Sequence, residues 1–267
     1  MTSHLKRWMT GLISVPLLFI TILFGSGEIF LILIFLMTLG AALEYNAMFF
    51  SKSRFFEKSI FCFAALMMPL SAFTGGISNL LFVLIALFVV AFLLFLLSEK
   101  SRTPNMEGIN RIAFGLLYIP MMMSYLILLR DHPDGVLWIF FMVVLAFSGD
   151  TTAYYIGRKF GKHKLIPNIS EGKTVEGTIG SILGSIIGCV VFSELMMDLS
   201  VIHALIIGFF GNIVGELGDL CESILKRSAG VKDSGFILPG HGGILDRLDC
   251  ILFIAPFLFY YRFFIID

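Results

Sequence analysis

Long runs of apolar residues, separated by short polar segments, dominate the chain. A helix needs about 20 apolar residues to cross a bilayer core of about 30 Å. The runs are continuous and do not alternate with polar residues as the strands of a membrane barrel would. The pattern therefore predicts an all-α, polytopic integral membrane protein with nine transmembrane helices, at about residues 9–25, 28–45, 58–75, 79–97, 112–129, 136–156, 177–193, 201–218 and 250–266.

Basic residues are distributed unequally between the predicted loops. With the N-terminus in the cytoplasm, 17 of the 19 Lys and Arg residues fall on inside segments, and only Arg130 and Arg262 fall outside. Because cytoplasmic loops carry an excess of Lys and Arg, this split predicts a cytoplasmic N-terminus and an outside C-terminus. Lys6 and Arg7 precede the first apolar run, but no small-residue cleavage site follows, so we expect a retained helix.

The polar residues are concentrated in the second half of the chain. Two long, glycine-containing loops, 157–176 and 219–249, are predicted to be cytoplasmic. We therefore expect residues 1–130 to form an N-terminal transmembrane scaffold and residues 131–267 a C-terminal catalytic transmembrane region that carries both loops.

Composition supports a membrane protein and excludes several other classes. Hydrophobic residues make up 58% of the chain and charged residues 14%, against about 25% charged residues in soluble domains. Mean hydropathy is +0.94, which also excludes a disordered chain. The formal net charge is zero, so no nucleic-acid partner is expected. The four cysteines form no CxxC pair and are expected to be packing residues.

Three acids surround the second loop. Asp219 lies where the eighth apolar run ends, and Asp246 and Asp249 would share one face if the ninth helix began near residue 244. Carboxylates brought together at the membrane interface are the ligands that Mg²⁺ uses beside substrate phosphates. The alternative is that these acids are solvated or paired with Arg227 and Arg247.

The same loop combines basic side chains with a glycine-rich turn. Positive-inside topology alone would explain its basic residues, which are Lys226, Arg227, Lys232 and Arg247. It would not explain the run Pro239-Gly240-His241-Gly242-Gly243, whose glycines let backbone amides approach an anion closely. Together with the acids, the loop indicates a site for a metal-bound polyphosphate, although His241 taken alone could be an ordinary loop residue.

A second polar cluster lies around the first loop. Asp150 falls inside the sixth predicted helix, where an ionisable group is a functional candidate because its burial in lipid is costly. Lys173 and Glu176 are three residues apart at the entry of the seventh helix, and a surface ion pair between them is the alternative to a site. Glu44 is expected to reach the cytoplasmic interface rather than a ligand.

The polar motifs resemble a known family. The run from Ser223 to Asp249 is similar to the signature of phosphatidate cytidylyltransferases, also called CDP-diacylglycerol synthases. The matching positions are Ser223, Lys226, Arg227, Lys232, Asp233, Pro239, His241, Gly242, Gly243, Asp246, Arg247 and Asp249. Residues 150–158, 161–165 and 173–177 also resemble the family. One departure is Ser170-Glu171-Gly172, where family members usually have Ser-Pro before the lysine segment.

The resemblance implies a reaction, a cofactor and a set of site residues. CTP and phosphatidic acid would give CDP-diacylglycerol and pyrophosphate in phospholipid biosynthesis, at a multi-pass enzyme of the cell inner membrane whose site faces the cytoplasm. Mg²⁺, with a second cation left open, would be held by Asp219, Asp246 and Asp249. The other implied catalytic residues are Lys226, Arg227, Lys232, Asp233, His241 and Arg247, and the implied substrate-binding residues are Asp150, Lys173, Glu176, Ser223, Gly242 and Gly243. The implied partners are CTP, phosphatidic acid and the lipid bilayer, and a homodimer is left open.

Other functions compete with this interpretation. A CTP-dependent polyprenol or phytol kinase would also join a nucleotide to a lipid, but it would transfer the γ-phosphate and release CDP. An ion-coupled transporter would use acids near the membrane as an ion pathway. A CDP-alcohol phosphotransferase is excluded because its D-G-x₂-A-R motif is missing, and Asp134-Gly135 is followed by Val-Leu-Trp.

Overall fold

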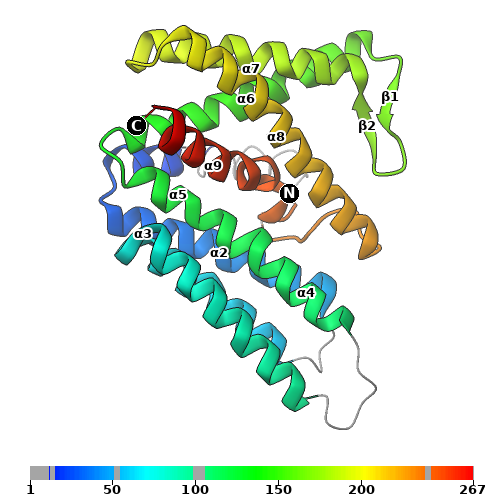
Figure 1. The fold of residues 1–267 in the computed structure, drawn as a ribbon. Helices are drawn as coiled ribbons and strands as arrows, with labels where there is room; N and C mark the ends of the chain where they lie inside the picture. The colour runs from blue at the N-terminus through cyan, green and yellow to red at the C-terminus, as the bar shows by residue number, and fades with distance from the viewer. Residues whose placement is uncertain (1–11, 13–15, 51–54, 99–105, 238–241, 267) are drawn as a thin grey trace. The chain divides into compact units, whose positions relative to one another are not determined.

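The computed structural model describes residues 12, 16–50, 55–98, 106–237 and 242–266 and is predominantly helical (Figure 1), which confirms the predicted all-α fold. Its elements are α2 (Gly27–Phe49), α3 (Phe55–Ser98), α4 (Met106–Leu116), η1 (Leu117–Met121), α5 (Met122–Arg130), α6 (Gly135–Phe160), β1 (Lys164–Ile166), β2 (Ser170–Thr174), α7 (Val175–Met196), α8 (Val201–Ser228), η2 (Leu245–Arg247), α9 (Asp249–Tyr261) and η3 (Arg262–Ile266).

Seven helical segments in the described part of the chain are long and apolar enough to cross a membrane. One of them, Glu57–Leu94, has 38 residues and would be about 57 Å long as an unbroken helix, nearly twice a bilayer core. It is broken at Gly75 and Gly76, where Gly76 has φ +65°, a conformation that glycine adopts readily. The whole helix α3 covers two of the predicted spans, 58–75 and 79–97. The first predicted span lies only partly within the described residues, so the count of nine stays a prediction.

The chain divides into two compact units. Unit 1 comprises residues 1–131 and 231–247, and unit 2 comprises residues 132–230 and 248–267. The predicted division into a scaffold and a catalytic region stays a prediction. Residues 231–247, which we expected to belong with the C-terminal region, are part of unit 1.

The two basic residues expected outside the membrane are both engaged in protein contacts. In unit 1, the guanidinium of Arg130 donates to the carbonyl oxygen of Gly25 at 2.7 Å and lies 5.1 Å from the ring centre of Phe30. In unit 2, Arg262 is only 7% exposed and its guanidinium lies 5.5 Å from the ring centre of Trp138. Both cations are therefore held by contacts within the protein, and their place outside the membrane stays a prediction.

In unit 2, small residues bring α6 and α7 close together. Gly180, Gly184 and Gly188 recur every four residues along α7, and a side chain at Gly184 or Gly188 would clash with Thr152 or Ser148 of α6. This small-residue spacing is typical of tightly packed helices in membranes. The row of glycines therefore lets α6 and α7 pack closely against each other.

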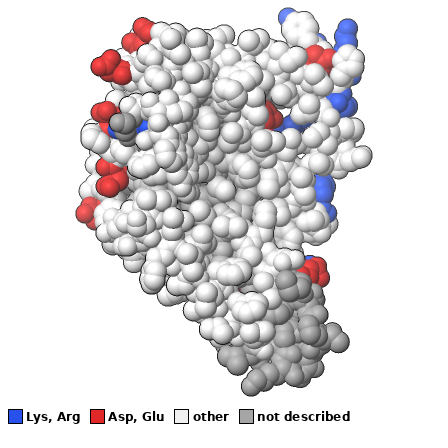
Figure 2. All heavy atoms as spheres, in the orientation of Figure 1, with Lys and Arg blue, Asp and Glu red and all other residues white. Residues whose placement is uncertain are grey.

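A short antiparallel hairpin, β1–β2, joins α6 to α7 and forms most of the predicted loop 157–176. The hydroxyl of Thr174 accepts a hydrogen bond from the backbone N–H of Gly177 at 3.1 Å and so caps α7. Figure 2 shows Lys and Arg side chains gathered at the hairpin end of this unit, and Asp and Glu side chains at the end where α7 meets α8. This charge separation agrees with a hairpin on the cytoplasmic side.

Candidate active site

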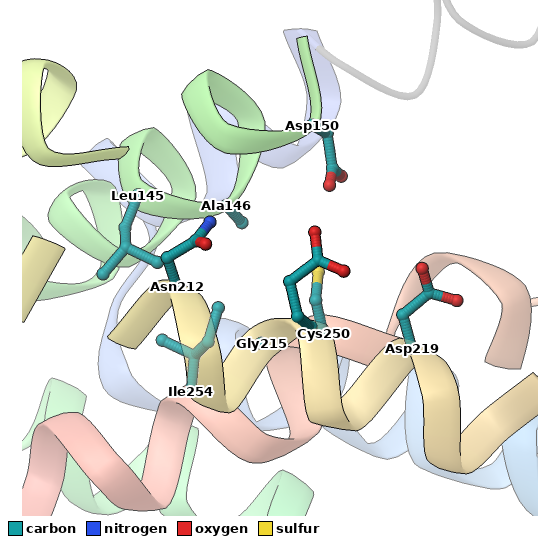
Figure 3. A pocket seen from close by; sticks show the side chains of 9 residues that line it. Leu145, Ala146, Asp150, Asn212, Gly215, Asp219, Cys250 and Ile254 are labelled. Atoms are coloured by element: carbon teal, nitrogen blue, oxygen red, sulfur yellow. The ribbon is translucent and has the colours of Figure 1, made fainter. Parts of the chain in front are cut away.

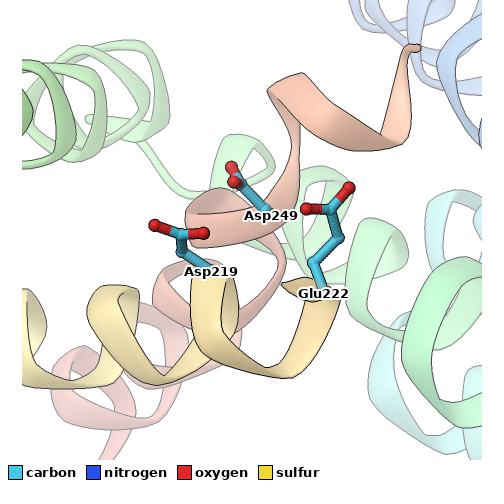
Figure 4. Close-up of side chains that lie close together, drawn as sticks. All are labelled: Asp219, Glu222 and Asp249. Carbon is cyan, nitrogen blue, oxygen red and sulfur yellow. The ribbon is translucent and has the colours of Figure 1, made fainter. Parts of the chain in front are cut away.

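Three carboxylates meet where α8 and α9 come together in unit 2. Asp219 and Glu222 lie on α8, Asp249 is the first residue of α9, and their ligand atoms lie within 4.8 Å of one another (Figure 4). Gly218 permits this approach, since a side chain there would clash with the Asp249 carbonyl. An all-oxygen donor set of this charge suits a hard divalent cation such as Mg²⁺.

Two lysines contact these carboxylates. Lys173, on β2, makes ion pairs with Glu216 and with Asp219, the latter at 2.7 Å. The Lys226 ammonium lies 2.5 Å from a carboxylate oxygen of Glu222, whose side chain is fully buried. The hairpin and α8 therefore place one ammonium group on each side of the carboxylates.

A small pocket in unit 2 extends the acidic cluster. Asp150 of α6 lines it together with Asn212, Glu216 and Asp219 of α8 (Figure 3). Counting Glu222 and Asp249, five carboxyl groups are gathered here with two lysines. With all groups ionised the cluster carries a net negative charge, which favours the binding of a further cation.

Lys173 keeps its positive charge over the physiological range. Burial alone would lower the pKa of its ammonium group, but the carboxylates of Asp219 and Glu216 outweigh burial, and the pKa lies above its ordinary value. A group with a raised pKa stays protonated below its ordinary value and loses its charge only at higher pH. Lys173 is therefore a fixed cation and not a proton acceptor near neutral pH.

In the described part of the chain, Glu176 and Lys173 have different partners, so the surface ion pair between them, the alternative to a site, is not formed. Its carboxylate lies 2.7 Å from Nδ1 of His163 and accepts a hydrogen bond from the backbone N–H of Lys162 at 3.1 Å. Glu176 therefore ties the start of the hairpin to the first turn of α7, while Lys173 turns to α8. The ion-pair alternative is replaced by two separate sets of contacts.

Asp246 lies in unit 1, in the short turn η2. Its Oδ2 atom accepts hydrogen bonds from the backbone N–H groups of Ser234 at 3.0 Å and Gly243 at 2.8 Å. Because α9 begins only at Asp249, the expectation that Asp246 and Asp249 share a helix face is wrong. A metal-binding role for Asp246 stays a prediction. Gly242, before this turn, has φ +84°, which favours glycine.

Of the remaining residues implied by the resemblance, Ser223 contacts the acidic cluster. The Ser223 hydroxyl donates to Asp219 at 3.4 Å. Arg227, Lys232, Asp233 and Arg247 are exposed, and their roles stay predictions. His241 lies outside the described residues, so its role also stays a prediction.

Two acids of the cluster were missed by the sequence analysis. Glu216 and Glu222 stand three residues before and after Asp219, and this spacing places all three near one side of α8. Lys226 continues the series four residues after Glu222. The signal was therefore a charged row on an otherwise apolar helix, which the motif from Ser223 onward does not include.

Replacing Lys173 by Met should lower the turnover of the purified protein at least tenfold, or about 1.4 kcal/mol, because it removes the ammonium group from two carboxylates. The raised pKa predicts the same factor at pH 6.5 and pH 8.5. The exposed Lys159 gives the matched control, Lys159→Met, with little loss. A factor that changed steeply between the two pH values would show that Lys173 titrates there.

Fold and site together define a multi-pass membrane protein with an acidic cluster that two lysines contact. A family model described as "Cytidylyltransferase family" matches residues 5–265. The chain belongs to this family, which confirms the resemblance seen in the sequence and the predicted class of enzyme, a nucleotidyltransferase.

Among three similar bacterial proteins, two carry names in agreement with the family. A phosphatidate cytidylyltransferase of Bacillus subtilis is 43% identical over 179 residues, which cover 66% of this chain and 66% of that protein. An uncharacterized protein of Escherichia coli is 40% identical over 127 residues, or 48% of this chain and 43% of that protein. A phosphatidate cytidylyltransferase of Staphylococcus haemolyticus is 35% identical over 257 residues, covering 94% of this chain and 96% of that protein.

Proposed function

We propose that the protein transfers the cytidylyl group of CTP to phosphatidic acid, with release of pyrophosphate and formation of CDP-diacylglycerol. The observation that carries this proposal is the cluster of five carboxyl groups and two lysines in a membrane protein of the cytidylyltransferase family. The names of the relatives from Bacillus subtilis and Staphylococcus haemolyticus support phosphatidic acid as the acceptor.

The chemistry requires charge neutralisation more than proton transfer. A phosphate oxygen of the lipid attacks the α-phosphorus of CTP, the bond from that phosphorus to the bridging oxygen breaks, and pyrophosphate leaves. The attacking oxygen is already anionic at neutral pH, so no strong general base is needed. Repulsion between the two anions is the obstacle, and positioned cations lower it, as in other phosphoryl transfers.

Asp219, Glu222 and Asp249 are the residues that would hold a divalent cation, and we propose Mg²⁺. When bound, such a cation neutralises charge on the phosphates. Lys226 and Lys173 would exchange their carboxylate partners for phosphate oxygens when CTP binds, and Asp150 would close the membrane side of the site. We propose that Asp246 also contributes to the reaction, as the resemblance of its motif implies.

The proposed site faces the cytoplasm, where CTP is present. The basic hairpin end of unit 2 supports this orientation, as does the distribution of Lys and Arg along the sequence. Phosphatidic acid would enter from the bilayer alongside the helices. We propose the inner membrane of a bacterial cell as the location.

The position of the transferred phosphorus tests the function. Purified protein is incubated with phosphatidic acid and with CTP labelled at either the α- or the γ-phosphate, and the lipid product is separated. The proposal predicts label in the lipid from α-labelled CTP only, with γ-label released as pyrophosphate. Lipid labelled from γ-labelled CTP would identify a kinase instead, and an unlabelled lipid fraction in both reactions would favour a transporter.

A further inference from the structure

In unit 1, Glu44 is a buried carboxylate within the apolar helix α2. Instead of reaching the aqueous interface, as the sequence suggested, the residue is only 4% exposed. A carboxylate at such a position is costly unless hydrogen bonds compensate for the lost water. Its partners therefore reveal what it does.

All the partners of Glu44 that the structure gives belong to one loop. Its two carboxylate oxygens accept hydrogen bonds from the backbone N–H groups of Ile244 and Leu245, both at 2.9 Å, and from the hydroxyl of Ser234 at 3.0 Å. Residues 200 positions away in sequence are thus tied to the second half of α2. These hydrogen bonds connect both ends of the loop from Ser234 to Leu245 to Glu44.

The same serine connects Glu44 to Asp246. The hydroxyl of Ser234 lies 3.0 Å from Oδ2 of Asp246, and Asp246 accepts the backbone N–H of Ser234 as well. Glu44, Ser234 and Asp246 form a continuous chain of hydrogen bonds, which we name the loop anchor. Asp246 lies at its end, so Glu44 and that carboxylate belong to one hydrogen-bonded network.

Two glycines of the loop are explained by this anchor. A side chain at Gly243 would clash with Ser234 and Glu44, and one at Gly235 would clash with the Glu44 carboxylate. Gly40, one turn before Glu44 on α2, leaves room for the side chain of Ile244. The close fit holds the two described ends of the loop, at Ser234 and Gly235 and at residues 243–245, against α2.

We infer that Glu44 is a positioning residue for the cytidylyl transfer proposed above. From the N-terminal half of the chain, it positions Ser234, Ile244 and Leu245, which adjoin Asp233 and Asp246 in sequence. It acts through the loop anchor and does not itself contact substrate. The inference rests on the proposed function, since it assigns Glu44 to that reaction.

Glu44→Gln should lower kcat at least tenfold, because the amide group would turn a donor toward backbone N–H groups that need an acceptor. KM for phosphatidic acid should change less than threefold, because Glu44 positions the loop and does not contact the lipid. Glu28→Gln, the same substitution at an exposed acid of α2, is the control and should keep full activity. A kcat of Glu44→Gln within twofold of the control overturns the inference.

A second variant separates positioning from folding. Ser234→Ala removes only a hydroxyl from the anchor and should also lower kcat about tenfold. The double variant Glu44→Gln with Ser234→Ala should be no more than threefold worse than the worse single variant, because both break one chain of bonds. If the losses of the two single variants multiplied in the double variant, the inference would be contradicted. Full activity of Ser234→Ala would contradict the inference as well, even if Glu44→Gln does not fold. A wild-type protein that forms no CDP-diacylglycerol would instead contradict the proposed function.

Discussion

Asp249→Asn is expected to lower the turnover of the purified protein at least about a thousandfold, which corresponds to about 4 kcal/mol of transition-state stabilisation. The amide oxygen can still accept the hydrogen bond that Asp249 receives from the backbone N–H of Cys250, so α9 should begin as before. The lost negative charge, however, weakens the carboxylate cluster with Asp219 and Glu222 as a cation site. Initial rates across a range of Mg²⁺ concentrations measure the effect.

The control for this variant is Asp198→Asn, which makes the same change at an exposed acid between α7 and α8. It should leave both turnover and Mg²⁺ dependence within twofold of wild type. If Asp249→Asn behaved in the same way, the carboxylates of α8 and α9 would be paired only with lysines, and the catalytic cation would have to be sought elsewhere.

Asp246 is expected to be nearly as sensitive, and two substitutions separate its possible roles. Asp246→Asn keeps an oxygen that can accept from Ser234 and Gly243, whereas Asp246→Ala removes every acceptor. If the negative charge of Asp246 contributes to phosphate transfer, both variants should lose at least about a hundredfold, or about 2.7 kcal/mol, in turnover.

A different result would assign Asp246 to the loop alone. In that case Asp246→Asn would retain turnover within about threefold of wild type, while Asp246→Ala would lose it together with thermal stability. Turnover and melting temperature, measured on the same preparations, distinguish the two outcomes.

Much of the fold could be predicted from the sequence because a bilayer imposes simple rules. Continuous apolar runs of sufficient length must form helices, and the excess of Lys and Arg in certain loops orients them. The same reasoning found Asp219, Asp249 and Lys173, since charged residues at the ends of apolar helices are conspicuous. It also identified the polar motif from which the family could be inferred.

The missing parts depend on contacts between distant segments. Glu44 accepts its hydrogen bonds from a loop about 200 residues later, and no pattern in the sequence near Glu44 indicates these bonds. The residue was therefore predicted to reach the cytoplasmic interface. Glu222 was not predicted as a site residue because it precedes the motif by one residue. A shared face of Asp246 and Asp249 depended on a helix that begins near residue 244, and that condition does not hold, because a separate 3₁₀ turn, Leu245–Arg247, precedes the start of α9 at Asp249.

Mn²⁺ binding tests most directly whether the carboxylates of α8 and α9 hold the cation. Mn²⁺ accepts the same hard oxygen ligands as Mg²⁺, and its electron paramagnetic resonance signal separates free from bound ion. In detergent-solubilised protein without nucleotide or lipid, wild type and Asp198→Asn should bind Mn²⁺ with equal affinity, and Asp249→Asn should bind at least tenfold more weakly. Equal affinity of all three proteins would contradict a cation site formed by Asp219, Glu222 and Asp249.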